Sequence, residues 1–149
     1  MDQDYLAAIL NAALDTLYEQ ERDAIRFDVA ERTICARLAA ILQASFGDHA
    51  VHAEYNRHGV RPKEISLPNA DGVLTDTLVS PDIVVHQPGH DRQNILVVEV
   101  KKTTNNLPDD GDVWKVGQIK EQIGYHFAVF LRLPAGRNAE RNDVRMIWV

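Results

Sequence analysis

Two stretches near the N-terminus carry apolar residues at helical spacing. The first predicts a helix over roughly residues 4–19. The second predicts a helix that begins near Asp28 and ends at Gly47, because Asp28 and Glu31 have the D-x-x-E spacing of a capping box and glycine commonly ends helices. The apolar stripes consist of Leu6, Ile9, Leu10, Ala13, Leu14 and Leu17 in the first helix, and of Ile34, Leu38, Ile41, Leu42 and Phe46 in the second.

After Gly47 the pattern changes from helical to alternating, which is typical of strands. Residues 57–76 mix Gly, Pro and polar residues, so a long loop or ragged hairpin is expected there. A further helix is predicted from Asp112, its N-cap, to Gly124. Strands are predicted over residues 51–56, 78–86, 94–101, 125–133 and 144–149. This order predicts one α/β domain over residues 1–149 with a mixed central sheet.

The composition is that of a globular domain, with 149 residues, 45% hydrophobic and 26% charged. No apolar run reaches the roughly 20 residues that span a bilayer, and nothing resembles a signal peptide, so a cytoplasmic protein is expected. The single cysteine, Cys35, has no partner for an internal disulfide. The net charge of −6 argues against a large non-specific nucleic-acid-binding surface and leaves room for a local basic groove.

Three charged residues interrupt otherwise apolar strands. Because side chains alternate along a strand, Asp82 shares one face with Val84, and Glu99 and Lys101 share one face of the next strand. If these strands are neighbours, the two carboxylates approach each other, and a divalent cation would remove their repulsion. Hard oxygen ligands favour Mg²⁺, with Mn²⁺ as a substitute, over Zn²⁺.

These residues, Pro81-Asp82 and Glu99-Val100-Lys101, resemble the motif of the PD-(D/E)xK, or restriction-endonuclease-like, nuclease superfamily. The resemblance implies an αβββαβ core over about residues 28–133, with an extra N-terminal helix and an extra C-terminal strand. It also implies that Asp82, Glu99 and the Val100 carbonyl bind Mg²⁺, and that Lys101 lies beside the attacking water and the scissile phosphate. The expected activity is phosphodiester hydrolysis of DNA, or else RNA, by a metal-activated water.

Two helices can add residues to such a site. Many members of the superfamily contribute a glutamate from the helix before the sheet, and Glu31 fits that place as a catalytic and metal-binding residue; alternatively, it only closes a capping box with Asp28. Members also often place a lysine or glutamine from the crossover helix near the site. Lys115, as a nucleic-acid contact, and Gln118, as a catalytic residue, are the candidates, and an ordinary polar helix face is the alternative.

The densest basic region follows the first strand and contains Arg57, Arg61 and Lys63. With Lys102 it is expected to contact nucleic-acid phosphates at the rim of the site, and solvated loop charge is the alternative. His86 lies on the Asp82 face and is interpreted as a structural histidine.

A function of a different class is also open. The same fold could be a catalytically silent binding or assembly module that works with a protein partner. The acidic charge favours this, and so does the apolar strand ending at Trp148, because an apolar edge strand invites pairing with another chain. The partner would be a second copy in a homodimer or another protein. A third possibility is the nuclease domain of a defence or toxin system, whose partner supplies target binding.

Overall fold

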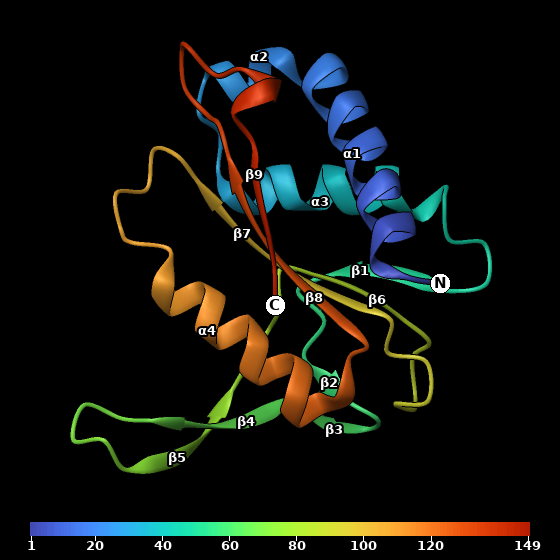
Figure 1. The fold of residues 1–149 in the computed structure, drawn as a ribbon, viewed down its shortest axis with the longest axis vertical. Helices are drawn as coiled ribbons and strands as arrows, with labels where there is room; N and C mark the ends of the chain where they lie inside the picture. The colour runs from blue at the N-terminus through green and yellow to red at the C-terminus, as the bar shows by residue number, and fades with distance from the viewer.

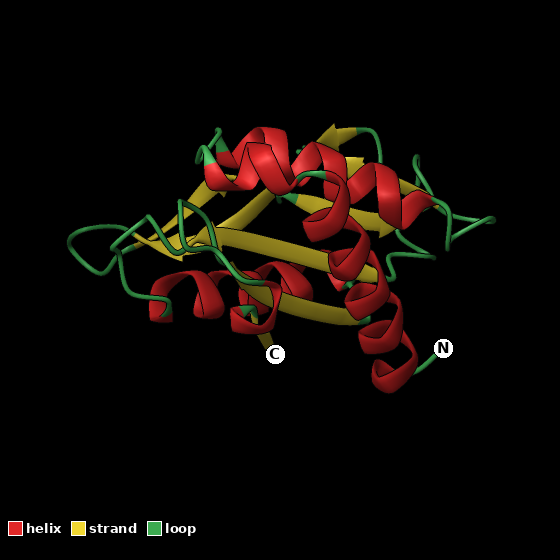
Figure 2. Ribbon diagram, turned by 90° about the horizontal axis from the view of Figure 1, so that it is seen from above, coloured by secondary structure: helices red, strands yellow, loops and turns green.

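A mixed five-stranded sheet forms the centre of the molecule, with helices on both faces, in a computed structural model that describes residues 1–149 (Figures 1 and 2). The strands lie in the order β1-β6-β7-β8-β9, and only β7 and β8 are parallel. Their bounds are Ala50–Ala53 for β1, Ile83–His86 for β6, Leu96–Lys102 for β7, Phe127–Leu133 for β8 and Arg145–Trp148 for β9. The predicted α/β class and mixed sheet are confirmed.

The helices divide between the two faces of the sheet (Figure 2). Helices α1 (Gln3–Gln20) and α3 (Glu31–Gln43) cover one face, and α4 (Asp110–Ile119), extended by a π-helical turn over Lys120–Gly124, covers the other. Helix α4 is the crossover that parallel pairing of β7 and β8 requires. No helix is both long enough and apolar enough to cross a membrane.

Apolar periodicity decides what each element buries. The predicted stripe of α1 is inside, where Leu6, Leu10 and Leu14 are fully buried. Strand β7 is buried on both faces, as expected for a central strand between helical layers. Its Val98 packs in the core under α1 and α3, whereas Val97 packs in the second core under α4. Glu99 and Lys101 alternate with the residues of the first core, so they lie on the α4 face, as Val97 does.

The capping box predicted for the second helix is wrong. Helix α3 begins at Glu31, after Ala30, and no side chain caps it. Asp28 lies outside the helix with a φ of 55°, in the left-handed region. Its carboxylate accepts hydrogen bonds from Lys102 Nζ and Thr104 Oγ1, both at 2.9 Å. Asp28 therefore binds the end of β7 and is not free to start the helix.

The stretch predicted as a loop or ragged hairpin contains two small antiparallel sheets. Strands β4 and β5 form an arm that projects from the body of the molecule (Figure 1). The strand predicted over residues 78–86 is divided, since β5 ends at Leu78 and β6 begins at Ile83; Pro81 lies between them and has no N–H to donate. A short helix, α2 (Arg22–Arg26), was not predicted. The small strands are β2 (Arg57–His58), β3 (Arg61–Pro62), β4 (Glu64–Pro68) and β5 (Leu74–Leu78).

Candidate functional site

Asp82 and Glu99 meet where β6 begins and β7 approaches its end. Val84 pairs with Val97, and this antiparallel register brings Asp82 opposite Glu99 on the α4 face. The two carboxyl groups hydrogen-bond to each other. Asp82 Oδ2 also accepts the Val100 N–H at 2.7 Å. The chain thus brings two carboxyl groups together at a backbone amide.

Burial makes this pair reluctant to ionise. It raises the pKa of Glu99 well above its usual value, and the charge of Asp82 raises it further. Burial also raises the pKa of Asp82, although the Val100 N–H and the hydrogen bond from Glu99 oppose the shift. Two buried carboxylates so close together are stable only if they share a proton or gain a cation.

Glu31 reaches the same end of the sheet from the first turn of α3. Its carboxylate accepts the Lys102 N–H at 3.3 Å. Burial raises the pKa of Glu31, and the charge of Asp82 is the next cause. The capping box does not form, and the Lys102 N–H instead holds the Glu31 carboxylate within electrostatic reach of Asp82.

Two rows of side chains cross the sheet on the α4 face. The strand registers align Glu99 with Phe130 on β8 and Ile147 on β9, so the acidic pair lies beside a fully buried aromatic ring. The next row aligns Lys101 with Arg132 and Arg145. The rows place apolar surface next to Glu99, which accounts for its burial, and positive charge one step further along.

Lys101 is buried, and its ammonium group has two partners at the start of α4. Nζ donates to the Pro108 carbonyl at 2.9 Å and forms an ion pair with Asp112. The charge of Asp112 also contributes to the raised pKa values of Glu31 and Glu99, so this ion pair lies beside the carboxyl groups. Asp112 was predicted only as a helix cap, yet it holds the lysine of the motif.

Arg132 organises the loop that leads from β7 to α4. Its guanidinium donates to the carbonyls of Lys102, Asn105 and Leu107 at 2.7, 2.7 and 2.8 Å, and it pairs with Asp109 at 3.0 Å. The sequence analysis missed this residue. A charged side chain on the inward face of an apolar strand was the signal that could have identified it.

The two candidates on α4 differ in position. The positive charge of Lys115 lowers the pKa values of both Asp82 and Glu99, so Lys115 faces the acidic pair. Gln118 instead accepts a hydrogen bond from Gln122 Nε2 at 3.1 Å, and Gln122 in turn binds the backbone of Ser66 on β4. Gln118 also lines a groove beside β9, and its hydrogen bond is to Gln122 and not to the pair.

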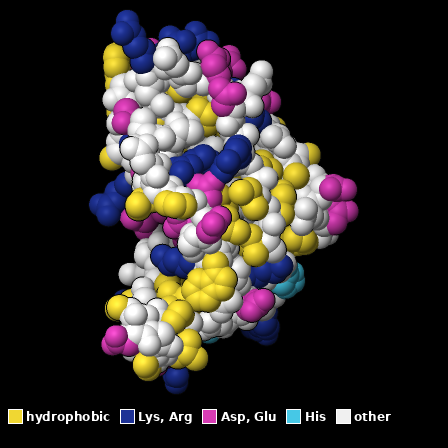
Figure 3. All heavy atoms as spheres, turned by 60° about the vertical axis from the view of Figure 1, so that its left-hand side comes forward, with side chains coloured by type: hydrophobic (Ala, Val, Ile, Leu, Met, Phe, Trp, Pro, Cys, Tyr) yellow, Lys and Arg dark blue, Asp and Glu magenta, His cyan; other side chains and the backbone are white.

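The expected basic rim is smaller in the structure than in the sequence. Arg57 and Arg61 are exposed on the β2–β3 hairpin. Lys102 Nζ is bound to Asp28 and to the Val29 carbonyl, at 2.9 and 3.0 Å. In Figure 3 acidic side chains gather near the middle of the face shown, with Lys and Arg side chains around them. Lys102 is therefore paired with an acidic side chain, and its contact with phosphate stays a prediction.

Lys63 is also not at a surface rim, because only 1% of it is exposed. Its Nζ donates to the Tyr125 hydroxyl at 2.9 Å and lies 5.2 and 5.4 Å from the ring centroids of Tyr55 and Tyr125. The long side chain folds inward, so its ammonium group contacts a hydroxyl and two aromatic rings in place of water. Burial lowers the pKa of Lys63 to about 8.

We expect Lys63→Met to change how stability depends on pH. Folded Lys63 loses its proton near pH 8, whereas unfolded lysine loses it near 10.4. This group therefore makes the wild-type protein more stable as pH rises from 8 to 10, and the variant lacks that gain. The stability of the variant relative to wild type should fall by about 2 kcal/mol over that range. Urea unfolding at pH 7.5 and 10 measures it, and a constant difference would contradict the burial of a charged Lys63.

His86 belongs to a neighbouring aromatic cluster. It is buried, its Nε2 lies 2.9 Å from His52 Nδ1, and its ring packs edge-on against Tyr55. Burial lowers the pKa of His86 to about 4, and the positive charges of His52 and Lys63 contribute. His86 is therefore neutral near pH 7 and has structural partners, in line with the interpretation of a structural histidine.

Oxygen donors dominate the site. The structure contains no group of three or more His, Cys, Asp and Glu side chains that already converge as a metal cage. Neither Asp82 nor Glu99 forms an ion pair, and Lys115 acts on them only through its charge. Carboxylate oxygens are the ligands that hard divalent cations prefer, and a bound cation would relieve the burial of this pair. Asp82, Glu99 and Glu31, with the Val100 carbonyl, are the groups available to hold it.

Comparison of the chain with protein-family models, with curated proteins and with solved structures found no match. The functional argument therefore depends on the geometry of the site.

The acidic pair predicts a second pH effect. Folded Glu99 keeps its proton to higher pH than Glu99 in the unfolded chain does. The metal-free protein therefore loses stability through this group as pH rises above the ordinary pKa of glutamate, near 4. Glu99→Gln should lack this loss, so its stability relative to wild type should rise between pH 5 and 8. Urea unfolding with a chelator measures the difference. Titration of His86 makes stability rise with pH below pH 6.5, but it does so equally in both proteins. Parallel curves of stability against pH would contradict a raised pKa of Glu99.

Proposed function

We propose that this chain is a divalent-metal-dependent nuclease of the PD-(D/E)xK type that hydrolyses phosphodiester bonds in DNA, or else in RNA. The observation that carries the proposal is the buried carboxyl pair of Asp82 and Glu99, hydrogen-bonded to each other on adjacent strands with Lys101 two residues further along. Two adjacent buried carboxylates repel each other, so such a pair needs a shared proton or a bound cation.

The topology supports this proposal. The elements α3, β1, β6, β7, α4 and β8 occur along the chain in the αβββαβ order of the superfamily core, with the small strands β2 to β5 inserted between β1 and β6. Strands β1, β6 and β7 form an antiparallel meander, and β8 returns parallel to β7 after the crossover helix. In this interpretation α1 and β9 are the additional N-terminal and C-terminal elements.

Four groups are available as metal ligands: the carboxylates of Asp82, Glu99 and Glu31, and the Val100 carbonyl. The N–H and C=O of one strand residue point to the same edge, and the Val100 N–H points to Asp82, so its carbonyl is directed to the same side. When bound, Mg²⁺ would activate water for attack and offset charge that develops on the phosphate.

Two lysines would receive the phosphate. Lys115 is already within electrostatic reach of the carboxyl pair. Lys101 is held by Asp112 and the Pro108 carbonyl, and in this proposal a phosphate oxygen replaces Asp112 as its partner. Both ammonium groups would stabilise negative charge that develops on the phosphate.

The test combines metal binding and cleavage. Calorimetric titration with Mn²⁺ should show binding that Glu99→Gln weakens. Incubation with Mg²⁺ and labelled single-stranded DNA, double-stranded DNA or RNA should yield products with 5′-phosphates from at least one of them. A pure protein that binds no Mn²⁺ and cleaves none of the three would overturn the proposal.

A second candidate function is that of a binding module with a silent site, and the charge distribution favours it. The chain carries a net charge of −6, and of the expected phosphate contacts Lys63 and Lys102 are buried or paired. If this is the function, metal binding and cleavage fail together while recognition of a protein partner persists.

A further inference from the structure

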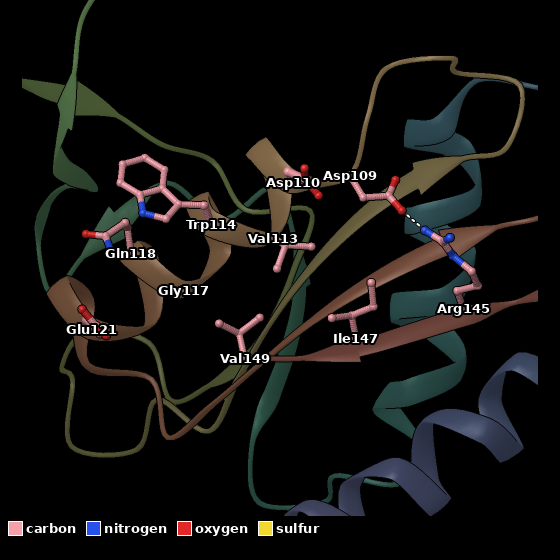
Figure 4. Close-up of a pocket in the computed structure, with 10 residues that line it drawn as sticks. All are labelled: Asp109, Asp110, Val113, Trp114, Gly117, Gln118, Glu121, Arg145, Ile147 and Val149. Atoms are coloured by element: carbon pink, nitrogen blue, oxygen red, sulfur yellow. Dashed lines mark ion pairs between the residues drawn. The ribbon is translucent and has the colours of Figure 1, made fainter. Parts of the chain in front are cut away.

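A groove of about 900 Å³ runs between α4 and β9, on the face of the sheet that carries the acidic pair (Figure 4). Its apolar lining includes Val113 and Trp114 from α4 and Ile147 from β9. Trp114 is 49% exposed, a large apolar surface to leave in water. The groove thus has the chemistry of a surface that another chain covers.

The wall formed by β9 is one edge of the sheet. Strand β9 pairs with β8 and with nothing on its other side. The Val149 N–H donates to the Ala128 carbonyl at 3.0 Å, so alternate residues from Val149 back along β9 point toward β8. Met146 and Trp148 therefore direct their N–H and C=O groups outward. An added strand would find free backbone partners at these two residues.

The length of the groove matches a short strand. It extends along α4 from Asp110 to Glu121, roughly 16 Å at 1.5 Å per residue. Five residues of extended chain span about the same distance. Alternate side chains of such a segment would enter the groove between Trp114 and Ile147, at the first, third and fifth positions.

Charge identifies the kind of chain that fits. Asp110 and Glu121, near the two ends of the groove, are exposed and form no ion pair. Asp109 is already paired with both Arg132 and Arg145. The two free carboxylates repel nucleic acid, and they disfavour a second copy, which would bring the same two acids to the interface.

We propose that this groove binds an extended segment of a partner protein, which adds a strand to β9 with an apolar residue between two basic ones. The apolar side chain fills the space beside Trp114, and the flanking Lys or Arg side chains pair with Asp110 and Glu121. This inference is independent of the proposed nuclease activity, because it uses none of the carboxyl groups of that site.

The probe is a blocked peptide with the core Lys-Thr-Val-Thr-Lys, compared with the same peptide carrying Glu in place of both Lys. We expect the basic peptide to bind at least tenfold more tightly. In hydrogen exchange followed by NMR it should protect the amides of Met146 and Trp148. Equal binding of the two peptides, or protection elsewhere, would overturn the proposal. Protection of these two amides without peptide, rising with protein concentration, would instead assign the edge to a second copy.

Two sets of variants separate the backbone from the charge. Met146→Pro removes one outward N–H at an edge where proline is tolerated, and Met146→Ala is its match because it loses the same side chain but keeps the N–H. Binding should be lost in the first and kept in the second. Asp110→Lys with Glu121→Lys changes only exposed residues and should reverse the preference to the acidic peptide. If the double variant still prefers the basic peptide, the charge argument is wrong even where the proline variant fails to fold.

Discussion

Asp82→Asn is expected to lower the rate of Mg²⁺-dependent phosphodiester cleavage by about 10²–10³-fold. The substitution removes one of the two adjacent carboxylates while its amide oxygen can still accept the Val100 N–H, now 2.7 Å from Asp82 Oδ2. The strand end should therefore keep its shape and lose only the charge that holds a cation. Single-turnover cleavage and Mn²⁺ calorimetry measure the two consequences, and thermal unfolding reports whether the fold is intact.

Asp48→Asn is the matched control, because it removes the same charge from an exposed residue on the loop before β1. It should cleave as the wild type does. Equal losses in both variants would mean that net charge, and not the site, determines the rate. Cleavage by Asp82→Asn within about twofold of wild type would show that the nuclease site lies elsewhere.

The approach of Asp82 to Glu99 could be predicted because it depends on two local regularities. Side chains alternate with a period of two, so the face of each residue follows from its position in the strand. The short connection over residues 87–95, which contains Gly89, makes β6 and β7 neighbours, since antiparallel strands need little connecting chain. Neither step required knowledge of distant contacts.

The partners of long charged side chains could not be predicted in the same way. Lys63, Lys102 and Arg132 appear in the sequence as positive charges, and position alone does not tell whether the end of the side chain reaches water. The structure directs Lys63 to Tyr125, Lys102 to Asp28 and Arg132 to the loop before α4. Each of these hydrogen bonds joins residues at least 25 positions apart, beyond the range of any local pattern.

The prediction of where α3 begins was wrong for a related reason. The D-x-x-E spacing is a local signal, and at Asp28 a tertiary contact prevails over it. The Asp28 carboxylate accepts hydrogen bonds from Lys102 and Thr104 in place of the helix N–H groups that it would accept as a cap. Glu31 is then left to accept the Lys102 N–H, so one long-range contact determines both the helix boundary and the position of a site residue.

Arg132→Met is expected to lower the free energy of unfolding by about 3–5 kcal/mol. The variant keeps a long apolar side chain but loses hydrogen bonds to the carbonyls of Lys102, Asn105 and Leu107, and it removes a partner of the half-buried Asp109. A buried carbonyl left without its donor costs more free energy than the net contribution of the hydrogen bond, because it has also lost its hydration. Urea unfolding measures the change, with Arg137→Met as the control, because Arg137 is exposed and forms no ion pair.

The same variant connects the loop to the proposed chemistry. Arg132 holds the loop that carries Pro108, and the Pro108 carbonyl binds Lys101 Nζ at 2.9 Å. If this loop positions Lys101, Arg132→Met should also lower the cleavage rate under conditions where the protein is fully folded, while Mn²⁺ binding at Asp82 and Glu99 is retained. A loss of stability below about 1 kcal/mol would contradict the organising role of Arg132. A stability loss without slower cleavage would separate the loop from Lys101, because Asp112 alone would then suffice to hold that ammonium group.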